Sequence, residues 1–206
     1  MELFGYNAEF KLDVLREIGN IGAGNAATAL SRLLDKRVNM QVPTVNVLPF
    51  EQIADRVGGA ETVVVAVYVR VVGDAPGNMF FIMSLEQANR LLNVLLGMKD
   101  VKGPGYSDME LSTLCEIGNI LGGSYLTSLA DLTGMRLAPT VPSVAVDMAG
   151  AILSYGLLQF GTMGDDALLI DTTFFEGDQQ AEGHFFFIPD PDAFPRLFHS
   201  LGVPVE

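Results

Sequence analysis

The first part of this chain is repeated in its second part. Residues 12–47 align with residues 111–146 without a gap, at an offset of 99, and sixteen of the thirty-six aligned pairs are identical. The similarity resumes between residues 79–97 and 184–202, at an offset of 105. Because each copy of a repeat is one structural unit, the fold is predicted for one copy and then doubled.

Each copy has the same predicted order of elements: a long helix, an extended segment through a proline, a variable middle, a hairpin and a closing helix. In the first copy, the alternating pattern at 38–47 and the β-branched run at 63–72, which ends in a Gly-Asp-Ala-Pro-Gly turn, predict strands. The copies extend over about 10–98 and 106–204. The polar, Gly/Pro-containing segment Lys99–Gly105 is predicted to connect them.

Two copies of one unit commonly pack about a pseudo-twofold axis, as the subunits of most homodimers pack about a true one. The predicted fold is therefore α+β, a single domain over residues 1–206 in which two long exposed helices lie on one face of a shared β-sheet. With 206 residues, of which 49% are hydrophobic, the chain is large and apolar enough for one substantial core.

Each long helix has one apolar and one polar stripe when it is projected at 100° per residue. The stripes predicted to be buried are Leu15, Ile18, Gly22, Ala26, Ala29 and Leu33 in the first copy, and Leu114, Ile117, Leu121, Tyr125, Ser128 and Leu132 in the second. The stripes predicted to be exposed are Asp13, Glu17, Asn20 and Gly24, and Ser112, Glu116, Asn119 and Gly123. A glutamate and an asparagine are thus predicted to face solvent in both copies. The pattern alone leaves open whether this repetition serves a function or helix packing.

Glycines within these helices require a reason, because each costs about 1 kcal/mol relative to alanine. Gly22 is predicted to face the core and to permit close packing of helices. Gly24 and Gly123 follow the asparagines on the exposed stripes, where a bare backbone lets another protein approach the carboxamide.

The acidic composition argues against two classes of partner. The formal net charge is −13, and no run of Lys or Arg follows the pattern of a phosphate-binding surface, so neither nucleic acid nor an anionic membrane surface is an expected partner, and no membrane insertion is expected either. No segment reaches the ~20 apolar residues of a membrane-spanning helix, and the first residues lack a secretory signal. A cytoplasmic protein is predicted.

Three patterns resemble other kinds of site. The glycines of residues 19–24 lie inside a helical pattern, whereas a dinucleotide-binding loop requires a preceding strand. Cys115 is the single cysteine and has no histidine near it in sequence, so a buried or semi-buried thiol is predicted and not a nucleophile. His184 and His199 have no partners at metal-ligand spacing, and no metal site is expected.

The spacing of the polar stripe resembles the signature of the CheC/CheX/FliY phosphatases of bacterial and archaeal chemotaxis. That signature is Asp or Ser, three residues, Glu, two residues, Asn, twenty-two residues and Pro. The chain has it twice, as Asp13, Glu17, Asn20 and Pro43, and as Ser112, Glu116, Asn119 and Pro142. The resemblance covers essentially the whole chain. It is strongest to the CheC branch, because CheX-like chains keep one signature and FliY-like chains carry a further switch domain.

The resemblance implies hydrolysis of the aspartyl phosphate on the response regulator CheY. Since asparagine does not titrate, Asn20 and Asn119 are expected to orient a water behind the phosphorus, as a glutamine does in GTPases. By the same resemblance, Glu17 and Glu116 pair with a lysine on the regulator.

The remaining positions of the signature have weaker assignments. Asp13 and Ser112 are expected to contribute to substrate binding, at the helix start or at the rim of the contact. No cofactor of the chain's own is expected, because any Mg²⁺ would come from the regulator's acidic pocket.

Asp147 precedes an apolar segment, Met148–Gly161, that is longer and less polar than its counterpart in the first copy. One interpretation makes Asp147 the N-cap of a helix. In CheC-like proteins this region resembles the surface that binds the receptor deamidase CheD, which would make Asp147 a partner-binding residue. Two alternative functions follow: a non-catalytic module that regulates CheD or sequesters phosphorylated CheY, and a component of the flagellar switch.

Overall fold

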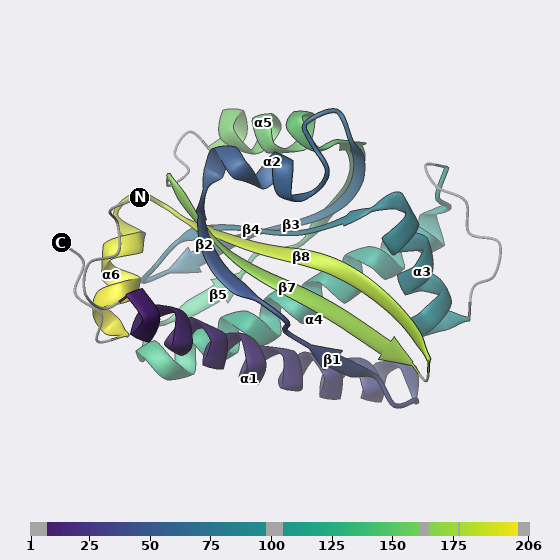
Figure 1. The fold of residues 1–206 in the computed structure, drawn as a ribbon, viewed down its shortest axis with the longest axis horizontal. Helices are drawn as coiled ribbons and strands as arrows, with labels where there is room; N and C mark the ends of the chain where they lie inside the picture. Colours follow the sequence, from purple (N-terminus) through teal and green to yellow (C-terminus); the bar gives the residue numbers. More distant parts are fainter. Residues whose placement is uncertain (1–7, 98–104, 161–164, 177, 202–206) are drawn as a thin grey trace.

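The computed structural model describes residues 8–97, 105–160, 165–176 and 178–201. The predicted connector lies almost entirely outside these ranges. The described residues form one mixed structure in which a curled antiparallel sheet carries helices on both faces (Figure 1).

The order of elements is the same in both copies. The first copy consists of α1 Ala8–Leu34, β1 Asn39–Gln41, β2 Val45–Pro49, a 3-10 turn η1 Phe50–Gln52, α2 Ile53–Arg56, β3 Val63–Gly73, β4 Gly77–Ser84 and α3 Leu85–Leu96. The second consists of α4 Asp108–Thr133, β5 Leu137–Pro139, β6 Ser143–Met148, α5 Ala149–Phe160, β7 Asp166–Glu176, β8 Gln179–Pro189 and α6 Ala193–Ser200. The predicted long helix, proline segment, hairpin and closing helix are confirmed in each.

The sheet is shared because the copies exchange strands. The hairpin strands β4 and β8 pair at its centre, β2 of the first copy pairs with β7 of the second, and β6 of the second pairs with β3 of the first. Val45 lies opposite Ile170, and Val144, which is 99 residues after Val45, lies opposite Val67. The two halves are therefore related by the predicted pseudo-twofold symmetry, and both belong to one sheet.

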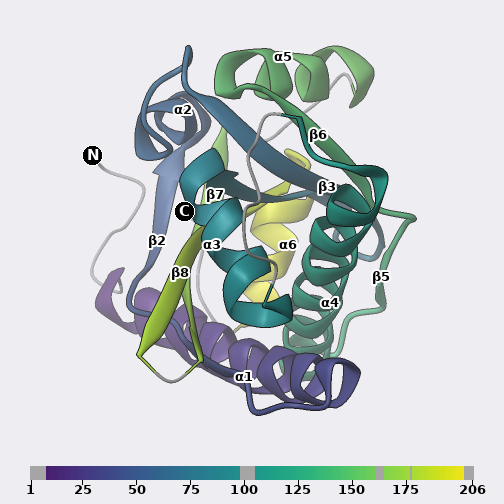
Figure 2. The same ribbon diagram turned by 90° about the vertical axis from the view of Figure 1, so that its right-hand side faces the viewer.

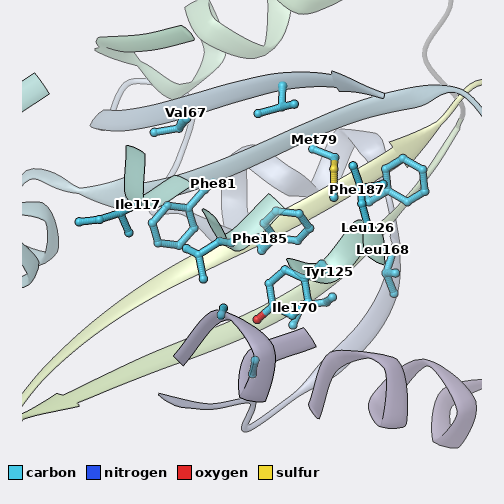
Figure 3. Close-up of a cluster of buried hydrophobic side chains, with 14 of the residues drawn as sticks. Val67, Met79, Phe81, Ile117, Tyr125, Leu126, Leu168, Ile170, Phe185 and Phe187 are labelled. Atoms are coloured by element: carbon cyan, nitrogen blue, oxygen red, sulfur yellow. The ribbon is translucent and has the colours of Figure 1, made fainter. Parts of the chain in front are cut away.

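Helices cover the two faces of the sheet unequally. The long helices α1 and α4, with α3 and α6, lie on one face, and the shorter α2 and α5 lie on the other (Figures 1 and 2). Alternate residues of each strand supply two separate cores. The larger one, beneath the long helices, includes Phe174 and the Phe81, Phe185 and Phe187 rings that Figure 3 labels, and the smaller one includes Phe80, Leu169 and Phe186.

The predicted buried stripes are correct over most of each long helix and wrong at the last turn. Leu33 is 57% exposed and Leu132 is 44% exposed, whereas Leu30 and Leu129 are buried. Each helix packs against both its neighbour and the strands, so the direction of its contacts changes along its length. A projection onto a single face does not capture this change.

The N-cap interpretation of Asp147 is wrong. Asp147 lies in β6, and its carboxylate accepts a hydrogen bond from the backbone of Met148 at 2.7 Å. The first amides of α5 donate instead to the carbonyl groups of Thr62 and Ala60, each at 2.9 Å. The loop before β3 therefore caps α5, which was not visible in the local sequence.

Candidate active site

The two long helices are held side by side by a glycine and a tyrosine. A Cβ atom on Gly22 of α1 would lie 2.3 Å from Cδ1 of Tyr125 in α4, so only glycine fits this contact. The Tyr125 ring is buried, packs 4.7 Å from the Phe185 ring and places its hydroxyl 3.0 Å from that of Thr172 (Figure 3). The predicted role of Gly22 in helix packing is confirmed.

In the first copy, the predicted polar stripe is exposed. Asp13, Glu17 and Asn20 all face solvent, and Asp13 accepts a hydrogen bond from Arg16 at 2.8 Å. A Cβ on Gly24 would meet no other atom within 4 Å. The backbone next to Asn20 is thus bare on its solvent side, as predicted.

The second copy differs at Asn119 and at Gly123, which is also half-buried. Ser112 and Glu116 are exposed, but Asn119 is half-buried and lines a groove of about 580 Å³ between α1, α4 and β5. Asn25 of α1 and Leu137 of β5 also line this groove. The prediction that both asparagines face solvent is therefore only partly correct for Asn119, because neighbouring elements that are distant in sequence flank it.

The glycine that precedes each asparagine brings the helix close to the sheet. A Cβ on Gly19 would lie 3.7 Å from Ile170, and one on Gly118 would lie 2.7 Å from Val67. Ile170 and Val67 are equivalent positions under the pseudo-twofold symmetry. Each asparagine therefore follows a residue whose backbone is pressed against the sheet, which fixes the height of its side chain above the core.

A model of the CheC-like family matches residues 10–47 and 109–146, the two segments that carry the repeated signature. The chain is 43% identical to the CheY-P phosphatase CheC of Bacillus subtilis, over 98% of this chain and 99% of that one. The chain belongs to the CheC-like family.

Other relatives agree with this membership. The CheC-like chain is 26% identical to the putative CheY-P phosphatase CheC1 of Halobacterium salinarum, over 93% of this chain and 96% of that one. Its fold is similar to that of Thermotoga maritima FliY in a crystal structure, with a TM-score of 0.73, 22% identity and 98% of each chain covered.

The patterns that resembled other sites in this CheC-like chain have structural explanations. Residues 19–24 lie inside α1, so they form no nucleotide-binding loop. Cys115 is half-buried, and burial, with a smaller contribution from Glu116, raises the pKa of its thiol, which disfavours a nucleophilic thiolate. The described residues contain no group of three His, Cys, Asp or Glu side chains that could hold a metal ion. None of the helices in these ranges combines the length and apolar character needed to cross a bilayer.

The structure also brings together a polar cluster that the sequence did not reveal. Asp171 of β7 accepts hydrogen bonds from Thr44 and from Arg56, the latter at 2.5 Å, and lies 2.7 Å from Nδ1 of His184. Burial alone would raise the pKa of Asp171, but the hydrogen bonds from His184, Thr44 and Arg56 outweigh it and lower the pKa to about 2. These four side chains are far apart in sequence. The pairing of β7 with β8 and β2 brings Asp171, His184 and Thr44 together, and α2 adds Arg56.

Proposed function

We propose that this chain is a cytoplasmic phosphatase that hydrolyses the aspartyl phosphate of the response regulator CheY, and so terminates or adapts the chemotaxis signal. The observation that supports it most strongly is the duplicated Glu–Asn pair, presented on two neighbouring helices that are held at a fixed spacing. The name of the Bacillus subtilis relative, a CheY-P phosphatase, supports the substrate.

Asn20 and Asn119 act by positioning water. A carboxamide both accepts and donates hydrogen bonds, so it can align a water molecule in line with the phosphorus without itself gaining or losing a proton. Phosphoryl transfer depends mainly on such positioning and on neutralising charge on the phosphoryl oxygens. Mg²⁺ held in the acidic pocket of CheY would supply that neutralisation.

Glu17 and Glu116 contribute to the binding of CheY. Each lies three residues before its asparagine, on the same stripe of its helix, and each is exposed. A lysine on the phosphorylation surface of CheY would pair with the carboxylate and set how deeply the asparagine enters the pocket. Asp13 and Ser112 lie further along the same stripes and contribute to the rim of the contact.

The proposal is tested by following the decay of phosphorylated CheY with substoichiometric amounts of the protein. Wild type is expected to accelerate the decay with multiple turnovers, each single variant, Asn20→Ala or Asn119→Ala, to retain part of the acceleration, and the double variant to show only the spontaneous rate. Asn46→Ala, which changes an exposed asparagine of β2, is the matched control and should behave as wild type. Circular dichroism establishes that the variants are folded. Full activity in the folded double variant would refute the proposal.

A binding function without turnover is distinguished by the same measurement, because it would protect or sequester CheY in proportion to the protein added. The receptor deamidase CheD is a second proposed partner. α5 lies on the opposite face of the sheet from α1 and α4 (Figure 2). Asp147 precedes α5 by two residues and is exposed. CheD bound there would leave both Glu–Asn pairs accessible to CheY. Loss of CheD binding in Asp147→Ala, with phosphatase activity unchanged, would support this arrangement.

A further inference from the structure

The polar cluster around Asp171 lies on the face of the sheet opposite the long helices. In β7, Ile170 contributes to the larger core and Leu169 to the smaller one, so alternation places Asp171 on the face covered by α2 and α5. Asp171 is only 7% exposed, and its carboxylate contacts Thr44, Arg56 and His184. Glu182 and these same side chains line a cavity of about 270 Å³. A buried carboxylate with three donors fixes the positions of its partners.

One partner, Thr44, belongs to the segment that contacts the helix backbone below the first Glu–Asn pair. The carbonyl of Thr44 accepts a hydrogen bond from the Asp171 amide at 3.0 Å, in addition to the bond between the two side chains. On either side of Pro43 and Thr44, side-chain atoms of Val42 and Val45 would lie 3.3 and 3.2 Å from a Cβ on Gly19. The residue after Gly19 is Asn20.

In the second copy the equivalent place is occupied by other residues, and its ion pair, Arg70 with Asp190 at 2.6 Å, lies beside Asn78. Ser143 is the counterpart of Thr44, and it lies opposite Tyr68 in the sheet. Tyr68 lies opposite Phe80, just as Asp171 lies opposite His184, so an aromatic pair with ring centroids 5.2 Å apart replaces the carboxylate–imidazole pair. The Tyr68 hydroxyl donates to Asn78. The two pseudo-symmetric sites therefore rest on chemically different supports.

We infer that Asp171 is a positioning residue for the first Glu–Asn site and not for the second. Through Thr44, it holds residues 42–45 against Gly19 and thereby fixes the height of Asn20. The segment below Asn119 depends instead on Tyr68 and Phe80 and on Arg70, which is hydrogen-bonded to Thr140. This inference rests on the proposed phosphatase function for its activity readout, but its structural part is measured independently.

The activity test isolates each site before Asp171 is changed. In an Asn119→Ala background, where only the first site works, Asp171→Asn is expected to lower kcat by about 3- to 10-fold with little change in KM, because misplacement of a water-orienting group acts on the reacting geometry. In an Asn20→Ala background the same substitution is expected to leave kcat unchanged. A general loss of stability would lower both, so an equal effect in the two backgrounds, or none in either, overturns the inference.

Thr44→Val provides a milder version of the same change, since it removes one hydroxyl from an exposed residue and keeps the carboxylate. It is expected to lower the activity of the first site in the same direction but by less. Ser143→Val, at the equivalent position of the second copy, is the matched control and should not affect the first site.

Hydrogen–deuterium exchange tests the structural part without any substrate. Asp171→Asn is expected to speed amide exchange in residues 19–21 and 42–45 and to leave residues 118–120 and 141–144 unchanged. Unchanged exchange in the first set would overturn the inference even if activity fell. If neither single-site background hydrolyses phosphate, the proposed function fails, and the exchange result still decides whether Asp171 supports the Asn20 segment.

Discussion

The Gly22 backbone of α1 lies directly against the aromatic ring of Tyr125 in α4, at a distance that leaves no room for a methyl group. This contact sets the spacing of the two helices that carry Asn20 and Asn119. The Tyr125 ring itself is fixed by Phe185 and Thr172 of the sheet, so the relative placement of the two sites depends on the core. Because the Gly22–Tyr125 contact is closely packed, the two helices cannot shift along each other without disturbing it.

Alanine substitutions at Gly22 and at Gly24 are expected to change the free energy of unfolding in opposite directions, which separates the effect of packing from that of helix propensity. Alanine favours a helix over glycine by about 1 kcal/mol, but overpacking against Tyr125 costs about 1–3 kcal/mol, so Gly22→Ala should lower the free energy of unfolding. Gly24→Ala has open space around its Cβ and should raise it by up to about 1 kcal/mol. Urea denaturation at pH 7 measures both, and a stabilising effect of Gly22→Ala would contradict the close contact.

Removal of the Tyr125 hydroxyl should destabilise the fold. Tyr125→Phe leaves the buried hydroxyl of Thr172 without its partner, which costs about 1–3 kcal/mol. Burial raises the pKa of Tyr125 to about 12, so the tyrosine is neutral at all ordinary pH values and the loss should be the same from pH 5 to pH 9. Combining Tyr125→Phe with Thr172→Val removes both polar groups. The double variant should then lose less than the sum of the two single variants.

The glutamates should affect binding of CheY more than turnover. Glu17→Gln and Glu116→Gln keep the shape of the side chain and remove its charge, so we expect the KM for phosphorylated CheY to rise several-fold and kcat to fall by less. Because exposed charges are screened by salt, the difference from wild type should shrink as ionic strength rises. Asp131→Asn, an exposed carboxylate near the end of α4, is the control. A fall in kcat at constant KM would show instead that the glutamates act in the chemical step.

Acid should remove the stabilisation that Asp171 provides. Its pKa in the folded protein is about 2, below the ordinary value of 3.8, so the ionised form is stabilised by folding. That contribution is present above about pH 4, the unfolded-state range, and is lost as the pH falls through about 2, below which the carboxyl group is protonated in both states. The difference in unfolding free energy between wild type and Asp171→Asn should therefore be constant from pH 5 to pH 7 and shrink below pH 4. Urea denaturation across this range measures it, and a difference that does not shrink at all between pH 5 and pH 2.5 would place the stabilisation elsewhere.

Most of the fold was predictable because the sequence contains two copies of the same structural unit. A single β-branched run such as Val63–Gly73 allows several structures, but the same order of helix, proline segment and hairpin in both copies limits the arrangement to a pseudo-symmetric pair. Local periodicity also identified the exposed Glu17 and Glu116 correctly. It failed at Leu33 and Leu132 and was only partly correct at Asn119, where the surroundings are supplied by elements distant in sequence.

The sequence by itself determined the repeat, the polar stripe and the spacing from each asparagine to its proline, because these depend only on residues close together in the chain. Only the tertiary structure decided that the copies exchange strands, that Gly22 meets Tyr125, and that Asp171 joins Thr44, Arg56 and His184. Pairing register and side-chain contact across the sheet are long-range relations, and a one-residue shift in register would move Asp171 to the opposite face. The identical motifs thus come from duplication of the sequence, and the difference between their supports comes from the packing around them.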